Sequence, residues 1–165
     1  MALSSFAAWW FLPFVVPVCL YVAWTDLARM KITNKAVMVL TGIFVVLGPF
    51  VMADLPQYGW QLGQLAIMLV LGIVLNAAGA MGAGDAKFIA ASAPYVALGD
   101  LRLVLALFAA MLLAAWCTHR IARATPLRRL APDWDSWETG KRFPMGLALG
   151  PTLALYLCLA ALNGA

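Results

Sequence analysis

Residues Trp60–Ala80 read WQLGQLAIMLVLGIVLNAAGA, an unbroken run without a charged side chain. A run of about twenty apolar residues is long enough to cross a bilayer as an α-helix, the conformation that satisfies its own backbone hydrogen bonds in lipid. Comparable runs lie on both sides of it, at Phe6–Thr25, Ala36–Ala53, Leu101–Thr118 and Met145–Leu162. The sequence therefore predicts an all-α, polytopic membrane protein.

The composition excludes other classes of protein. The chain has 165 residues, of which 65% are hydrophobic and only 11% charged, whereas soluble domains carry about 25% charged residues. A soluble globular enzyme and a disordered chain are both excluded. The length holds five or six spans with short loops, so we expect one integral-membrane domain over residues 1–165. The net charge of +4 is spread over short gaps between apolar runs, which does not indicate nucleic-acid binding.

A sixth, less regular span is predicted between the third and fourth long runs. Residues Asp85–Gly99 read DAKFIAASAPYVALG, a short segment rich in small residues and interrupted by Pro94. We expect a short or kinked helix here, which gives about six transmembrane helices.

The distribution of basic residues predicts the orientation. If the first long gap is cytoplasmic, six spans leave only Arg102 on the outer side. The inner side then carries Arg29, Lys31, Lys35, Lys87, Arg120, Arg123, Arg128, Arg129, Lys141 and Arg142. Such a bias is typical of cytoplasmic loops. We therefore expect both termini on the periplasmic side of a bacterial inner membrane.

The cysteines and the single histidine do not form a recognisable metal site. Cys19, Cys117 and Cys158 lie far apart and no CxxC pair occurs, so we expect neither a metal nor another cofactor. His119 has no patterned Cys or acidic neighbour. The first apolar run has no Lys or Arg before it, so we expect that helix to be retained rather than cleaved as a signal peptide.

Two acidic residues occupy costly positions at the edge of predicted spans. Asp26 ends the first span and Asp85 begins the fourth, directly after Gly82 and Gly84. Ionisable groups at membrane depth indicate function, and the charge-derived topology puts both on the cytoplasmic side. Two close carboxylates cannot both ionise cheaply, so such a pair supplies a general acid and a general base able to activate water. The alternative is helix capping or pairing with Arg29 and Lys87.

Three stretches resemble one protein family. Gly79–Phe88 reads GAMGAGDAKF and resembles the GxGD signature of type IV prepilin peptidases, which are membrane aspartyl proteases. Asp26–Asn34, DLARMKITN, is similar to the first-aspartate motif of that family, with Thr33 where Pro is frequent. Phe143–Gly150, FPMGLALG, resembles its late Pro-x-Gly motif, with Met145 where Tyr is frequent. The order and spacing resemble the short peptidases that serve Flp-type, tight-adherence pili.

The resemblance implies roles for individual residues. It makes Asp26 and Asp85 the catalytic pair, Gly82 and Gly84 the glycines that shape the second site, and Pro144 and Gly146 site-shaping residues of the last helix. Nothing matches the cysteine-containing insertion of the longer members, which also N-methylate the new pilin N-terminus, so this second activity stays open.

Several polar residues allow two interpretations. Asn34 either orients Asp26 or substrate, or caps the helix that starts near Lys35. Lys87 either favours the charged form of Asp85 or is an interfacial lysine. Asn76 is expected to form an interhelical hydrogen bond. The remaining acidic residues divide into Asp54 and Asp100, expected in solvated outer turns, and Asp133, Asp135 and Glu138, expected to pair with basic residues of their own loop or to attract a basic substrate.

The sequence thus predicts a membrane-embedded aspartyl endopeptidase. Its expected substrate is a pilin precursor, in which a basic N-terminal leader precedes a hydrophobic helix. The enzyme is expected to remove this leader at the cytoplasmic interface of the membrane. The expected partners are this precursor and the lipid bilayer. The alternatives are a small transporter or proton-relay subunit, in which the aspartates would carry ions, and a non-catalytic assembly subunit.

Overall fold

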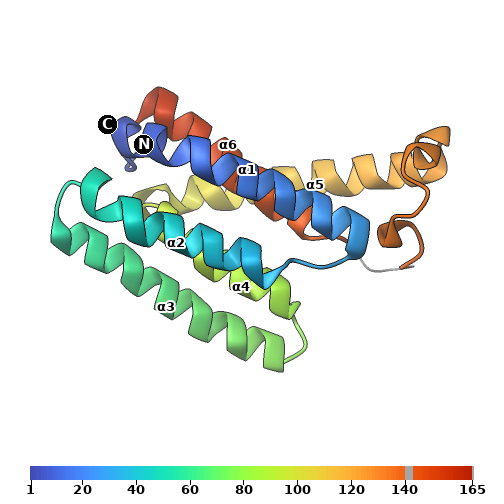
Figure 1. Cartoon of the computed structure of the whole chain (residues 1–165), viewed down its shortest axis with the longest axis horizontal. Helices are drawn as coiled ribbons and strands as arrows, with labels where there is room; N and C mark the ends of the chain where they lie inside the picture. Colours follow the sequence, from blue (N-terminus) through green and yellow to red (C-terminus); the bar gives the residue numbers. More distant parts are fainter. Residues whose placement is uncertain (140–142, 165) are drawn as a thin grey trace.

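The computed structural model describes residues 1–139 and 143–164, and this part of the chain contains helices and no strand (Figure 1). Lys141 and Arg142, which contribute to the predicted charge bias, lie outside the described residues. The α-helices are α1 (Ser5–Arg29), α2 (Asn34–Val51), α3 (Leu55–Ala77), α4 (Ala83–Ser92), α5 (Leu101–Ala124) and α6 (Gly146–Asn163). Short 3₁₀ turns are η1 (Ala93–Tyr95), η2 (Leu98–Asp100), η3 (Pro126–Leu130) and η4 (Asp135–Trp137).

Five helical segments are long and apolar enough to cross a membrane. They are α1, α2, α3, the continuous segment Leu98–Ala124 and α6. The all-α, polytopic prediction is therefore confirmed. The predicted sixth span is the ten-residue α4, followed by η1 at Pro94. At about 1.5 Å per residue, α4 rises about 15 Å, which is half the hydrocarbon thickness of a bilayer. That α4 crosses the bilayer therefore stays a prediction. The orientation of the termini depends on the number of spans and stays a prediction too.

Residues 54–59 lie between the second and third predicted spans and contain the start of α3. Helix α3 already begins at Leu55, with Pro56 in its first turn and the Asp54 carboxylate accepting a hydrogen bond from the Gln57 N–H at 2.7 Å. Proline is tolerated in the first helical turn, because the N–H that it lacks has no partner there, and aspartate is a good N-cap. These residues therefore start a helix instead of interrupting one.

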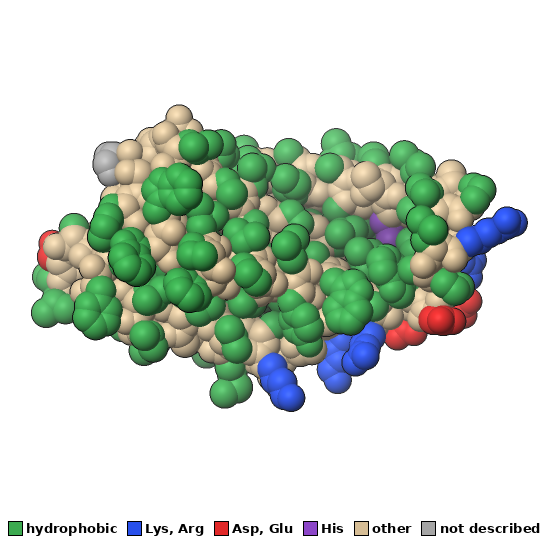
Figure 2. All heavy atoms as spheres, turned by 45° about the horizontal axis from the view of Figure 1, so that its top comes forward, with side chains coloured by type: hydrophobic (Ala, Val, Ile, Leu, Met, Phe, Trp, Pro, Cys, Tyr) green, Lys and Arg blue, Asp and Glu red, His purple; other side chains and the backbone are tan. Residues whose placement is uncertain are grey.

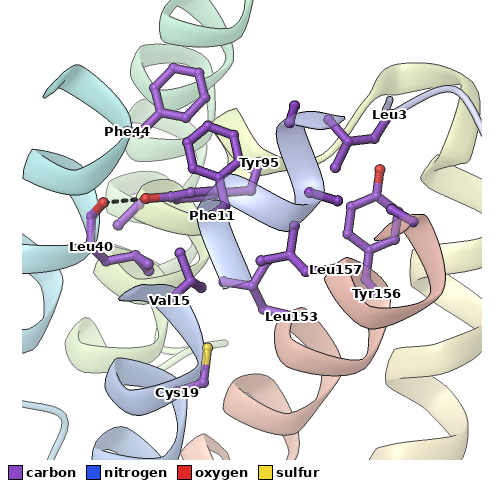
Figure 3. Close-up of a cluster of buried hydrophobic side chains, with 14 of the residues drawn as sticks. Leu3, Phe11, Val15, Cys19, Leu40, Phe44, Tyr95, Leu153, Tyr156 and Leu157 are labelled. Carbon is purple, nitrogen blue, oxygen red and sulfur yellow. Dashed lines mark hydrogen bonds between the residues drawn. The ribbon is translucent and has the colours of Figure 1, made fainter. Parts of the chain in front are cut away.

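An aromatic cluster joins the first two helices to η1. Phe11, Phe44 and Tyr95 are fully buried, and each ring lies 4.9 to 5.7 Å from the other two (Figure 3). The Tyr95 hydroxyl donates a hydrogen bond to the Leu40 carbonyl at 2.6 Å. Since buried hydroxyls need a partner, this bond fixes η1, and with it the end of α4, against α2.

Helix α6 is the most enclosed of the five long helices and packs along α1. The close approach depends on Gly150, because a Cβ there would collide with the Cys19 carbonyl. Small residues permit such contacts between membrane helices. The two chain termini consequently meet at one end of the bundle (Figure 1), where the Met1 amino group donates to the Asn163 carbonyl.

The surface is apolar along the length of the bundle. Figure 2 shows hydrophobic side chains over most of the visible face, with Lys, Arg and acidic side chains gathered mainly towards one end. Phe50 is 79% exposed and Met38 73%, fractions that would be costly in water over so large an area. This distribution is typical of a membrane protein.

Candidate active site

Asp26 lies in the last turn of α1 and is held by the first residue of α6. Its side chain is buried, and its Oδ2 accepts a hydrogen bond from the Gly146 N–H at 2.6 Å. A Cβ on Gly146 would lie 2.9 Å from the Cβ of Asp26, so only glycine allows this contact without a shift. Met30 ends α1 in the left-handed conformation (φ 49°), and its N–H donates to the Asp26 carbonyl.

Asp85 lies in the first turn of α4, which begins after Gly82. Gly84 packs against the loop that follows α1, since a Cβ there would lie 3.2 Å from the Cβ of Ile32. On the other side of α4, Gly72 of α3 faces Ala86 at a similarly short distance. Small residues on both sides therefore bring the start of α4 close to α3 and to the end of α1.

The two carboxylates lie close enough to interact electrostatically. Burial raises the pKa of the half-buried Asp85, the negative charge of Asp26 raises it further, and the Gly82 backbone amide partly opposes both effects, so that the pKa is about 6. Burial disfavours the charged form of a carboxyl group, and a neighbouring like charge does the same. The structure thus brings together the two aspartates that the sequence singled out.

Neither aspartate pairs with the lysine or arginine proposed as its structural partner. In the described part of the chain, the salt bridge is that between Arg128 and Glu138, at 3.2 Å. The Lys87 ammonium instead donates to Asn34 Oδ1 at 3.1 Å, which links α4 to α2. The alternative of simple ion pairing for these two acids is therefore not supported.

The sequence model of the type IV leader peptidase family matches residues 3–119. The protein belongs to this family. The leader peptidase is thus an aspartic-type prepilin peptidase, and its transporter and assembly-subunit alternatives are not favoured. Neither the curated proteins nor the solved structures contain a significant match to the chain.

The matched region of the leader peptidase contains Asp26, Asp85 and the glycines before Asp85, but it ends before α6. The family model therefore does not cover the late motif, Phe143–Gly150, whose assignment rests on the resemblance and on its place in the structure. Pro144 is fully buried at the start of α6, and Gly146 contacts Asp26 directly.

Two expectations for asparagine side chains are wrong in part. Thr33, not Asn34, is the N-cap of α2, because its side chain accepts from the Ala36 N–H at 3.3 Å. Asn76, in the last turn of α3, donates to the Met81 carbonyl at 2.8 Å in the loop that follows rather than to another helix. The loop between α3 and α4 contains Gly79 in the left-handed region (φ 73°), where glycine alone is unstrained.

The expectation for Asp100 is also wrong, since it is buried rather than solvated. Its carboxylate accepts hydrogen bonds from the N–H groups of Ala2 and Leu3 at 2.9 to 3.1 Å, and from the Tyr156 hydroxyl at 2.9 Å. These partners lie far away in the sequence, so no local signal indicated the contact.

The loop after α5 packs over the end of the bundle that contains Asp26. His119 stacks on Trp137 with ring centroids 5.0 Å apart, and Trp137 stacks on Trp134 at 5.7 Å. This loop and the end of α1 enclose a polar pocket of about 610 Å³, lined by Met30, Pro132, Asp133, Trp134, Asp135, Glu138 and Thr139. Within residues 1–139 and 143–164, no group of three or more His, Cys, Asp or Glu side chains is arranged to hold a metal ion.

Proposed function

We propose that Asp26 and Asp85 are the catalytic residues of this leader peptidase and hydrolyse the bond after a prepilin leader. One observation carries the proposal: two buried or half-buried carboxylates from different helices interact at one end of the bundle. Both lack a salt bridge within the described residues. Such pairs share one proton near neutral pH, so one member is charged and the other is neutral.

The charge interaction within the pair favours a division of roles. The Gly146 N–H stabilises negative charge on Asp26, and this charge raises the pKa of Asp85, so Asp26 is the base that removes a proton from the attacking water. Asp85, with a pKa of about 6, is the acid that donates to the carbonyl oxygen. The water oxygen bonds to the carbonyl carbon to form a tetrahedral diol. The C–N bond then breaks as the amine takes the proton held by Asp26, and one hydroxyl of the diol returns a proton to Asp85, which leaves a carboxyl group on the leader.

The substrate is proposed to be an Flp-type prepilin in a bacterial inner membrane. Its basic leader complements the polar pocket beside Met30, which is lined by Asp133, Asp135 and Glu138. Met30 follows Asp26 by only four residues, so a leader bound there leaves the scissile bond near the carboxylates. This arrangement requires the Asp26 end of the bundle to be cytoplasmic and the termini to be periplasmic.

Co-expression with an Flp-type prepilin tests the proposal. The wild type is expected to remove the leader, seen as a gel shift, whereas Asp26→Asn and Asp85→Asn are expected to leave the precursor intact while reaching the membrane in normal amount. Asp54→Asn is the matched control, because Asp54 is an exposed acid at the opposite end and asparagine also caps helices. Normal processing by either active-site variant would remove that residue from the mechanism.

A further inference from the structure

An apolar groove lies between α3 and α5 on the side of the bundle. Its volume is about 420 Å³. Its floor consists of buried side chains, Phe88 from α4 and Leu153 and Tyr156 from α6, and its walls include Ile67 of α3 and Leu105 of α5, each 58% exposed. The groove therefore opens towards the surface that faces lipid.

The groove begins next to the candidate active site and leads away from it. Phe88 lies one helical turn after Asp85 on α4, and Ile89, Ser92 and Ala93 continue the lining along α4 into η1. The far end is lined by Trp60, near the start of α3, and by Leu98. A chain leaving the carboxylates along this groove would run towards the end of the bundle that carries the termini.

One polar group of the groove has no partner. Gln64 of α3 is 8% exposed and lines the groove, and its Nε2 has no hydrogen-bond partner within the described residues. A buried amide without a partner is unfavourable, because it has lost its hydrogen bonds to water. A ligand with a hydrogen-bond acceptor would remove this cost, whereas a hydrocarbon chain would not.

We propose that this groove binds the hydrophobic helix of the prepilin and that the Gln64 amide donates a hydrogen bond to an acceptor of that helix. The inference rests on the proposed function. The polar acidic pocket, the two aspartates and the apolar groove follow one another in the order of basic leader, scissile bond and hydrophobic helix of the substrate.

Helix geometry gives the distance between the scissile bond and the group of the prepilin helix that accepts the hydrogen bond from Gln64. Gln64 precedes Gly72 by eight residues on α3, and Gly72 packs against Ala86, the neighbour of Asp85. Eight helical residues rise about 12 Å. The acceptor is therefore about two helical turns beyond the scissile bond.

Site-specific photocrosslinking tests the occupant in full-length Asp85→Asn protein, in which binding does not require cleavage. A benzophenone amino acid replaces Ile67 in the groove or Ile73, which lies about 240° further round α3 and is similarly exposed (61%). We expect a crosslink to the prepilin from position 67 that is at least tenfold stronger than from position 73. Equal crosslinking from both positions, or adducts to lipid alone from position 67, would overturn the proposal.

Kinetics separate helix binding from cleavage. Ile67→Trp is expected to lower the ratio of kcat/KM for full prepilin to that for a short leader peptide about tenfold, whereas Ile73→Trp leaves this ratio unchanged. Gln64→Leu is expected to raise KM for the full prepilin without lowering the stability of the enzyme, since it removes an unpaired amide. An unchanged ratio for Ile67→Trp would contradict the inference. Failure of the wild type to cleave either substrate would contradict the proposed function instead, and the crosslinking result would still decide the groove.

Discussion

The two ends of the bundle each contain a buried aspartate, and the two differ in their partners. At the end with the termini, Asp100 accepts hydrogen bonds from two backbone N–H groups and from the Tyr156 hydroxyl. At the other end, Asp26 accepts one such bond, from Gly146, and lies close to a second carboxyl group, Asp85. Hydrogen-bond donors therefore stabilise the negative charge of Asp100, whereas the negative charge of Asp26 lies beside another acidic group.

Burial of an acid is therefore a weak sign of chemistry by itself. A carboxylate that is surrounded by donors has a low tendency to take up a proton and stabilises the fold. When two carboxyl groups lie side by side, one of them stays protonated while the other is charged, as acid–base catalysis requires. The difference between the two ends can be tested by changing one side chain at a time.

Removing the charge gives the largest expected contrast. Asp26→Asn and Asp85→Asn are each expected to lower the rate of prepilin cleavage by at least about 100-fold, because a general acid or base is lost. Asp100→Asn is expected to retain cleavage by the folded protein. The rates are measured on purified, reconstituted enzyme at equal folded concentration. A loss of cleavage by Asp100→Asn of the same size would remove the distinction between the ends.

A methyl group at the hydrogen bond to Asp26 should have a smaller effect. Gly146→Ala places a Cβ about 3 Å from the Asp26 side chain, and displacement of a catalytic group by a fraction of an ångström is expected to lower kcat about tenfold with little change in KM. Gly63→Ala is the control, because a Cβ there meets nothing within 4 Å. Equal kcat values for both variants would show that the Gly146 contact does not position Asp26.

Stability is expected to respond at the opposite end. Asp100→Asn replaces an acceptor oxygen by an amide that faces N–H donors, so it is expected to lower the free energy of unfolding by about 1–3 kcal/mol. Unfolding is followed in detergent micelles by circular dichroism against denaturant. Tyr156→Phe removes two hydrogen bonds, the one that its hydroxyl donates to Asp100 and the one that it accepts from the Ala97 N–H, while the backbone bonds to Asp100 remain, so it should lose less. No loss of stability in either variant would mean that this cluster does not hold the termini.

The pH dependence gives the smallest effect and the most specific one. The pKa of Asp85 in the folded protein, about 6, exceeds the value of about 3.9 for an unfolded chain. The native state therefore holds the proton more tightly, and its stability decreases as the pH rises from about 4 through about 6. Asp85→Asn should remove this decrease.

Asp26→Asn should lower the pKa of Asp85, because a repelling negative charge is lost. The pKa is measured from the carboxyl infrared band of Asp85. An unchanged pKa would place the two carboxyl groups too far apart to act together.

The helices could be predicted from sequence because membrane spans follow from composition alone. The uncharged run Trp60–Ala80 and its four counterparts correspond to α1, α2, α3, α5 and α6. The errors lie at the ends, where single side chains decide. The apolar run starts at Trp60, whereas α3 already begins at Leu55 with Pro56 in its first turn, and the cap of α2 is Thr33 rather than its neighbour Asn34.

The candidate site was predictable in its residues and not in its contacts. Asp26 and Asp85 stand out because charges are rare near apolar runs, and the family resemblance names both, Asp85 through GxGD and Asp26 through the first-aspartate motif. The bond from Gly146 to Asp26 joins residues 120 positions apart, and the contacts of Asp100 cross 56 to 98 positions. Such pairings arise from helix packing, which a single sequence does not encode in any local pattern. For the same reason, the unpaired Gln64 was not recognised.

The aromatic stack of the loop after α5 gives this molecule an optical signature. Two nearly parallel indole rings with centroids 5.7 Å apart, those of Trp134 and Trp137, couple their electronic transitions, and the His119 imidazole also stacks on Trp137. Coupled indoles produce a paired band in circular dichroism that vanishes when the rings separate. Unfolding of this loop can thus be followed in real time without any attached label.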